Sequence, residues 1–247
     1  MLKAVTFDLG DTLIDYGPMH YRPMMKYGVR RAYEYLDSLG SAVALPPFRR
    51  FSWRMCSAAR HVWYRSKFLV QDRDVQPTIR RVLAALGIAL DQERERQVIR
   101  CFFAMLRQMA HPMPGAGDVL GALSERGLKL ALISNSVLPP WLPDESLQEA
   151  GLLGYLPARF YSCAVGVKKP RRGIFERALA ALGVAPAEAL HVGDRYLTDI
   201  WGARRAGLVT CLKLGYRSVP LPPVRPDFVI RDLPDLLPVV DRLMNAS

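Results

Sequence analysis

The hydrophobic pattern of this chain changes its period twice, and this limits the possible folds more than any other feature. Residues 3–8 form a short apolar run that is typical of a buried strand. Residues 18–112 then show helical spacing with almost no strand-like alternation, and from residue 113 onward short apolar strands alternate with amphipathic helices. The pattern predicts an α/β fold with a doubly wound, Rossmann-like parallel sheet and an inserted α-helical cap domain.

The cap leaves the core directly after the first strand. We expect the α/β core to comprise residues 1–16 and 113–247, and the helical cap to comprise residues 17–112. An insertion at this point lies over the crevice in which open α/β sheets bind ligands, so it is well placed to act as a lid. The predicted cap helices cover 24–39, 48–69, 77–87 and 92–110.

The predicted elements of the core alternate between strands and helices. Beyond the cap, strands are expected at 128–134, near 159–163, and at 189–193, 208–214 and 227–230. Helices are expected at 117–126, 171–183, 197–206 and at the C-terminal end.

Composition narrows the functional classes. The chain has 247 residues, half of them hydrophobic, which is enough for one large core or two smaller ones. The net charge of +11 would attract polyanions, but 27 of the 34 basic residues are arginines scattered in pairs, so we interpret the excess mainly as a compositional bias toward Arg and expect no nucleic-acid partner. Part of this charge suits a small anionic substrate. No long apolar segment and no Cys-x-x-Cys pair occurs, and we expect a cytoplasmic protein without a membrane partner.

The first strand ends on a candidate nucleophile. Asp8 closes the apolar run and is followed by Gly10, Asp11 and Thr12 in a polar turn. A carboxylate at the carboxyl end of a buried parallel strand faces the ligand crevice from a rigid element. The position two residues after Asp8, where an acid/base aspartate would be most useful, is occupied by Gly10.

Two later segments carry groups that bind phosphate. Ser134 and Asn135 follow a predicted strand, where a hydroxyl and backbone N–H groups can hold phosphate oxygens. Lys168 and Lys169 precede Pro170, and an ammonium near Asp8 would stabilise the ionised carboxylate. Taken singly, each segment is more often an ordinary turn or a solvated loop.

A third segment supplies two more carboxylates. Asp194 directly follows the apolar strand 189–193, and Asp199 lies five residues further on. Two carboxylates at a strand end beside Asp8 would repel one another unless a cation lay among them. Mg²⁺ fits such a site, since it prefers a few carboxylates, carbonyl oxygens and water.

These segments, taken in order, resemble the haloacid dehalogenase superfamily of hydrolases. The resemblance rests on FDLGDTL (7–13), LISNS (132–136), KKP (168–170) and VGD with Asp199, and the helical insertion is similar to that of the family's subclass with an α-helical cap. It implies a phosphatase acting on a small phosphorylated metabolite, with Asp8 as a nucleophile that forms an aspartyl-phosphate, Lys169 as the stabilising cation and Ser134 and Asn135 at the phosphoryl group. It also implies Mg²⁺, bound by Asp8, Asp194, Asp199 and the backbone carbonyl of Gly10.

Gly10 departs from the family pattern. Phosphatases of this family usually have Asp at this position, where it protonates the leaving group. Since positioned acid/base catalysis contributes about 10²–10⁴ in rate, we expect slow hydrolysis of esters with poor leaving groups and less effect on acyl or aryl phosphates. Asp11 is a weak candidate for the missing role, because alternation along the turn would direct it away from the phosphoryl site.

Two alternatives remain open. A haloacid dehalogenase-type hydrolase would use the same aspartate on carbon, but members of that group typically carry Tyr in place of Gly10 and lack the full acidic pair, whereas Asp194 and Asp199 are both present. A catalytically weakened binding or regulatory protein would agree with Gly10 and the charge of +11. The residues at the four strand ends favour the phosphatase.

Overall fold

A parallel sheet of six strands forms the centre of the core. The computed structural model describes residues 1–17, 21–68, 71–215, 218 and 224–245. The strands lie side by side in the order β5-β4-β1-β6-β7-β8, and every neighbouring pair is parallel. Their bounds are Ala4–Phe7 (β1), Lys129–Ser134 (β4), Ala158–Tyr161 (β5), Ala189–Gly193 (β6), Val209–Lys213 (β7) and Phe228–Ile230 (β8). The predicted doubly wound core is confirmed.

The first strand occupies the middle of this sheet. In the register of β1, Ala4 lies opposite Lys129 of β4 on one side and Ala189 of β6 on the other. All four residues of β1 are buried, as expected for a strand covered on both faces. The chain therefore delivers the residue after β1 to the centre of the carboxyl edge of the sheet.

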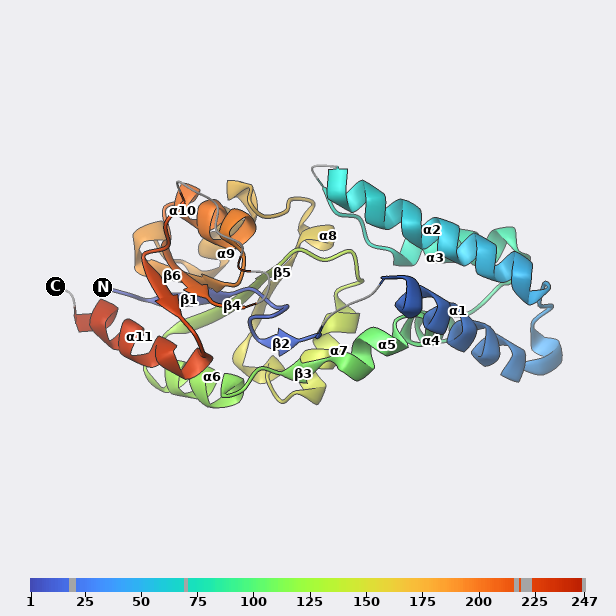
Figure 1. The fold of residues 1–247 in the computed structure, drawn as a ribbon, viewed down its shortest axis with the longest axis horizontal. Helices are drawn as coiled ribbons and strands as arrows, with labels where there is room; N and C mark the ends of the chain where they lie inside the picture. The colour runs from blue at the N-terminus through green and yellow to red at the C-terminus, as the bar shows by residue number, and fades with distance from the viewer. Residues whose placement is uncertain (18–20, 69–70, 216–217, 219–223, 246–247) are drawn as a thin grey trace.

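Helices cover both faces of the sheet (Figure 1). Val5 and Phe7 of β1 belong to the hydrophobic cluster that includes α6 (Ala116–Glu125) and α11 (Leu236–Asn245). Ala4 belongs to the opposite cluster, which is built on α9 (Arg172–Leu182) and includes Ala203 of α10 (Gly202–Arg205). Alternate residues of one strand thus anchor the two helical layers.

The helical cap has a hydrophobic cluster of its own. It lies beyond the carboxyl edge of the sheet, on the right in Figure 1, and is joined to the core by a short antiparallel pair, β2 (Ile14–Asp15) with β3 (His111–Pro112). The predicted boundaries at residues 16 and 113 fall beside this pair. The cap helices are α1 (Tyr21–Ser38), α2 (Phe48–Phe68), α3 (Gln76–Ala85), α4 (Gln92–Phe102) and α5 (Ala104–Met109). Among the described residues, none of the helices combines the length and apolar character needed to cross a bilayer.

Three elements differ from the sequence-based expectation. The helix predicted at 92–110 is interrupted at Phe103, where two consecutive phenylalanine rings enter the cap core edge to face at 5.0 Å. The helix predicted at 197–206 is a π-helical segment, η4 (Tyr196–Trp201), followed by α10. An additional helix, α7 (Trp141–Glu149), begins after a pair of prolines and contains a third in its first turn, where proline is tolerated.

The cap depends on a close approach between α1 and α4. A Cβ atom added at Gly28 of α1 would lie 1.9 Å from the backbone oxygen of Phe102, at the end of α4. Backbone atoms cannot yield to such a contact as a side chain could. Gly28 therefore permits the helix pair to approach closely enough to bury Val29 and Ala32.

We predict that Gly28→Ala destabilises the protein by about 2–3 kcal/mol, because the added methyl group forces the two helices apart. Thermal unfolding measures the effect, at roughly 2–4 °C per kcal/mol for a chain of this size. Gly154→Ala is the matched control, since nothing lies within 4 Å of its added Cβ, and we expect a change within about 0.5 kcal/mol. Equal effects of the two substitutions would contradict this account.

Candidate active site

The predicted site residues gather at the carboxyl edge of the sheet. Asp8 follows β1, Ser134 ends β4 and Asp194 follows β6, and these three strands are neighbours. The backbone N–H of Asp8 donates to the carbonyl of Val192 at 2.9 Å, which fixes its main chain against β6. The side chain of Asp8 is only 13% exposed. The nucleophile candidate is thus held on rigid structure in a largely dehydrated place.

Lys169 lies between two of the carboxylates. Its Nζ is 2.5 Å from Oδ1 of Asp8 and 2.6 Å from Oδ1 of Asp199, and the residue is only 2% exposed. Burial favours the neutral amine, but the charges of Asp199 and Asp8 outweigh it and raise the pKa of Lys169 above its ordinary value. Lys169 is therefore an ammonium at neutral pH.

Asn135 holds the backbone of Lys169. Its Nδ2 donates to the carbonyl of Lys169 at 2.9 Å, and its Oδ1 accepts from the N–H of the same residue at 2.8 Å. The two hydrogen bonds therefore use both the nitrogen and the oxygen of the Asn135 side-chain amide. The side chain of Asn135 thus fixes the main chain of Lys169, a role that the sequence did not indicate.

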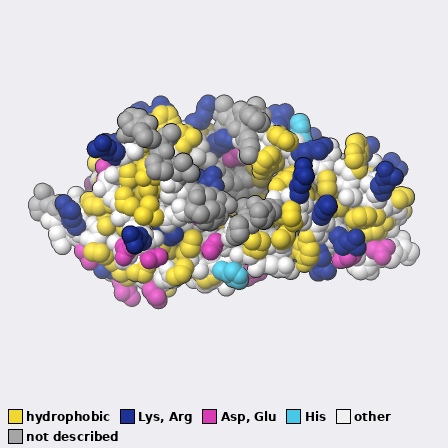
Figure 2. All heavy atoms as spheres, in the orientation of Figure 1, with side chains coloured by type: hydrophobic (Ala, Val, Ile, Leu, Met, Phe, Trp, Pro, Cys, Tyr) yellow, Lys and Arg dark blue, Asp and Glu magenta, His cyan; other side chains and the backbone are white. Residues whose placement is uncertain are grey.

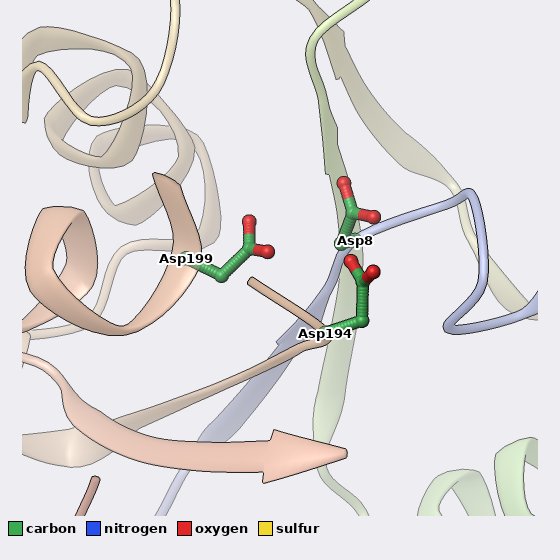
Figure 3. A group of neighbouring side chains, drawn as sticks. All are labelled: Asp8, Asp194 and Asp199. Carbon is green, nitrogen blue, oxygen red and sulfur yellow. The ribbon is translucent and has the colours of Figure 1, made fainter. Parts of the chain in front are cut away.

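Three carboxylates converge beside this ammonium. Oxygens of Asp8, Asp194 and Asp199 lie within 4.8 Å of one another (Figure 3). Burial raises the pKa of Asp8, the positive charge of Lys169 lowers it, and the negative charge of Asp199 raises it again. The net result is a pKa of about 6. Burial and the charges of Asp8 and Asp199 raise the pKa of Asp194 to about 8. Burial opposes ionisation of Asp199, but Lys169 overrides it and holds its pKa below the ordinary range.

This cluster has the donor chemistry of a divalent-metal site. Asp194 is fully buried, and neither carboxylate oxygen has a hydrogen-bond partner among the described residues. The nearest cation is Arg195, whose Nε is 3.9 Å from Oδ2 of Asp194. When ionised, three carboxylates beside one ammonium carry two excess negative charges, which a dication balances. An all-oxygen donor set suits Mg²⁺.

The carboxylate of Asp199 has neighbours on β6 and on its own segment of chain. The N–H of Arg195 donates to Oδ2 of Asp199 at 2.9 Å, and Nε2 of the buried His191 lies 3.6 Å from its Oδ1. Burial lowers the pKa of His191, and its Nδ1 is 2.9 Å from the hydroxyl of Thr6. A Cβ at Gly193 would lie 2.5 Å from Asp199, so only glycine admits this approach. His191 was not predicted, although a histidine inside an apolar strand is the signal that marks it.

The neighbourhood of Gly10 has room for a side chain. A Cβ built at Gly10 would meet the ring of Tyr16 at 3.5 Å, an ordinary van der Waals distance. Asp11 has a left-handed backbone (φ 62°) and is only 2% exposed. It is not among the residues that line the cavity over Asp8. A Cβ atom at position 10 therefore causes no clash, whereas Asp11 remains a weak candidate.

A cavity of about 630 Å³ lies between the core and the cap. The predicted residues Asp8, Ser134, Lys169 and Asp199 line its core end, together with Arg195, which the sequence analysis did not single out. Gly10 and Asn135 also line it.

Over the face of the molecule in Figure 2, Lys and Arg side chains are scattered across core and cap alike and form no single basic patch.

The cap is bound to the core by polar contacts beside this cavity. The ammonium of Lys168 donates to the carbonyl of Ser66 in α2 and lies 3.3 Å from Oδ1 of Asp72, which is buried. Ser162, at the start of α8 (Ser162–Val165), donates to the other oxygen of Asp72 at 2.6 Å. Lys168 and Lys169 therefore serve different partners, the first in the cap and the second at the nucleophile.

The model of the haloacid dehalogenase-like hydrolases matches residues 2–207. The chain belongs to this family. Two relatives are phosphoserine phosphatase from Thermus thermophilus, 39% identical over 143 residues, and glyceraldehyde 3-phosphate phosphatase from Pyrococcus furiosus, 33% identical over 150 residues. Each match covers 57% of this chain, and the chain spans only 55% and 57% of these relatives' own lengths.

A solved structure shows the same fold over the whole molecule. The 2-haloacid dehalogenase from Pseudomonas syringae pv. Tomato superposes with a TM-score of 0.65, covering 98% of this chain and 99% of that one, at 23% sequence identity. Identity at this level concerns the fold alone. The shared architecture therefore includes both the α/β core and the helical cap of this hydrolase family.

We predict that Asp194→Asn stabilises the metal-free protein at neutral pH by about 1–3 kcal/mol, because folding of the wild type must either protonate this buried carboxyl group or hold it charged beside carboxylates that repel it. The folded-state pKa of about 8 lies above the ordinary 3.8, so the stability contributed by protonated Asp194 is greatest below pH 3.8 and is lost as the pH rises through about 8.

Thermal unfolding in EDTA between pH 5 and 9 measures this effect. The variant is expected to lose part of the decline in stability with pH. Asp241→Asn, at a half-exposed surface pair with Arg126, is the control and is expected to keep the full decline. A destabilised Asp194→Asn variant would show that the charge is compensated in the metal-free protein.

Proposed function

We propose that this family member is a Mg²⁺-dependent phosphohydrolase that acts on a small phosphorylated substrate through an aspartyl-phosphate at Asp8. The observation that carries the proposal is the ammonium of Lys169 between Asp8 and Asp199, beside the carboxylate of Asp194, which has no hydrogen-bond partner among the described residues. The phosphatase names of two relatives at 39% and 33% identity support the same chemistry.

In the first step, an oxygen of Asp8 attacks phosphorus, and the bond between phosphorus and the leaving oxygen breaks. Lys169 keeps Asp8 ionised and balances charge on the phosphoryl group. In the second step, water attacks phosphorus, which releases inorganic phosphate and restores the Asp8 carboxylate. Mg²⁺, when bound, neutralises charge on the phosphoryl oxygens and orients them toward the nucleophile.

The remaining groups divide binding between them. Asp8, Asp194, Asp199 and the backbone carbonyl of Gly10 would hold Mg²⁺. The Ser134 hydroxyl would bind a phosphoryl oxygen. Asn135 would act by fixing Lys169, and Arg195 lines the same end of the cavity as a further cation for the phosphoryl group.

The leaving group receives no help from residue 10. Gly10 has no side chain that could donate a proton to the departing oxygen, and Asp11 lies outside the cavity lining. Alkyl phosphates, whose alkoxides are strongly basic, should therefore react slowly. Acyl and aryl phosphates leave as weaker bases and need less protonation.

We expect the wild-type protein to release phosphate from acetyl phosphate in the presence of Mg²⁺ and to lose this activity in EDTA. Asp8→Asn is expected to reduce kcat by at least about 10³-fold, because the amide is not a nucleophile. A malachite-green phosphate assay measures both effects, with the exposed Asp118→Asn as the surface control. Metal-independent chloride release from 2-chloropropionate, without phosphate release from any substrate, would instead support a dehalogenase. Salt-dependent nucleic-acid binding without turnover would support a binding protein.

We predict that Gly10→Asp increases kcat on glycerol 3-phosphate by about 10–100-fold, because the new carboxyl group can protonate the leaving alkoxide. Gly10→Asn matches the size but carries no acidic proton, so it should give no gain. The ratio of the two variants' rates, on glycerol 3-phosphate and on acetyl phosphate, separates acid catalysis from changes in shape. Equal rates for both variants on glycerol 3-phosphate would refute an acid role for position 10.

A further inference from the structure

The cavity has two chemically different ends. The charged residues that line it are Asp8, Lys169, Arg195 and Asp199, and all four belong to the core end. Among the described residues, the cap contributes no charged side chain to the lining. Its wall is apolar and aromatic, with Tyr21, Met24, Val62, Trp63, Phe103 and Leu106. A substrate with its phosphate at Asp8 must therefore place its organic part against an apolar wall.

This wall is poorly suited to a polyhydroxylated or zwitterionic group. A hydroxyl or ammonium moved from water to such a surface loses hydrogen bonds, at a cost that grows with every unpaired group. The part of the cap wall that the structure describes offers no ion-pair partner to an amino acid and no row of amide or hydroxyl groups to a sugar. The organic part that fits is one that gains free energy by leaving water.

Aromatic geometry in the wall favours a flat ring. Trp63 and Tyr21 stack with centroids 5.2 Å apart and an interplanar angle of 29°. The flexible thioether of Met24 lies in the same wall and adapts to the face or edge of an aromatic ring. A planar ring entering the cavity meets surfaces of matching shape and polarisability, and offset or edge-to-face contacts with them are favourable.

Few polar atoms interrupt this wall, namely the hydroxyl of Tyr21 and the indole nitrogen of Trp63 among the side chains named above. The Oη of Tyr21 is buried and has no hydrogen-bond partner among the described residues. Buried hydroxyls normally find partners, so the Oη of Tyr21 is a group to which a polar substituent of a ligand can hydrogen-bond. The wall thus accommodates an aromatic group with a polar substituent at one position and little other polarity.

The core end of the cavity independently favours an aromatic leaving group. Gly10 provides no acid for the leaving oxygen, so that oxygen must depart without being protonated by residue 10. A phenol has a pKa near 10, as the tyrosine side chain does, whereas a simple alcohol resembles water at about 16. An aryl oxide is therefore a feasible leaving group at a site where an alkoxide is not.

We propose that the substrate class is the aryl phosphates, with the phosphoryl group at Asp8 and the aromatic ring against Trp63 and Tyr21 under the cap. This inference rests on the proposed phosphohydrolase function and narrows its substrate. It places the protein apart from relatives named for phosphoserine and glyceraldehyde 3-phosphate, whose organic parts are small and polar.

The experiment compares three esters that separate binding from leaving-group chemistry. They are 2-naphthyl phosphate, which is apolar with an aryl leaving group, 2-naphthylmethyl phosphate, which is apolar with an alkyl one, and glycerol 3-phosphate, which is polar and alkyl. We expect kcat/KM for 2-naphthyl phosphate to exceed that for glycerol 3-phosphate by at least about 100-fold. The two naphthyl esters should share a similar KM and differ in kcat, since uniform binding changes KM alone.

Variants locate the ring. Trp63→Ala is expected to raise KM for 2-naphthyl phosphate by about 10–100-fold with little change in kcat, because it removes a contact made equally in the ground and transition states. Trp53→Ala, on the same helix but 64% exposed and outside the cavity lining, is the matched control and should leave both constants unchanged.

A binding measurement on the wild-type protein covers the case in which Trp63→Ala misfolds. Calorimetry with 2-naphthylphosphonate and methylphosphonate, neither of which can be hydrolysed, should show at least about 30-fold tighter binding of the naphthyl compound. Equal affinities would overturn the aryl inference.

The two proposals fail in different ways. Mg²⁺-dependent turnover of acetyl phosphate without any preference for the naphthyl ester would overturn the aryl class and support the phosphohydrolase. Tight binding of the naphthylphosphonate without turnover of any phosphate would overturn the phosphohydrolase and support an aromatic anionic ligand in this cavity.

Discussion

The buried ammonium of Lys169 is the contact that makes the rest of the site possible. Without it, three carboxylates would lie within 4.8 Å of one another in a place from which water is largely excluded, and repulsion would protonate or separate them. With it, Asp199 stays ionised and the carboxylate of Asp8 has a cationic partner, whereas burial and the other two carboxylates raise the pKa of Asp194 to about 8. The four side chains Asp8, Lys169, Asp194 and Asp199 therefore form a single electrostatic arrangement.

Backbone packing maintains this arrangement. Asn135 fixes the main chain of Lys169 with two hydrogen bonds, and the absence of a side chain at Gly193 lets Asp199 approach from η4. The π-helical turn η4 directs Asp199 back toward the sheet. Such turns are rare in proteins as a whole but occur often at functional sites. Precision at the reacting atoms thus comes from elements that do not themselves touch the substrate.

Much of the core could be predicted because its strands are continuous apolar runs with polar groups where they end. The run before Asp8 and the run before Asp194 both predict buried parallel strands, and parallel strands bring their carboxyl ends to one edge. That reasoning placed Asp8, Asp194 and Asp199 near one another, as the structure has them. The position of Lys169 beside Asp8 was expected from the family resemblance.

What the sequence did not reveal depends on tertiary contacts. The amide of Asn135 faces Lys169 across 34 positions of chain, and no local pattern encodes such a pairing. The cap helices show their buried faces by periodicity, but the same apolar residues can fill a core or line a cavity. From the sequence alone, Met24 and Trp63 are interpreted as packing residues. The structure shows that both line the cavity between cap and core. Helix α7 was missed because its prolines resemble those of a loop.

Lys168 and Lys169 are neighbours in the chain, yet one holds the cap and the other the nucleophile. Lifting the cap would break the contacts of Lys168 with Ser66 and Asp72 and would open Asp72, now 4% exposed, to water. Because the two lysines are consecutive, the same short segment of chain holds a polar contact to the cap and the ammonium that pairs with Asp8.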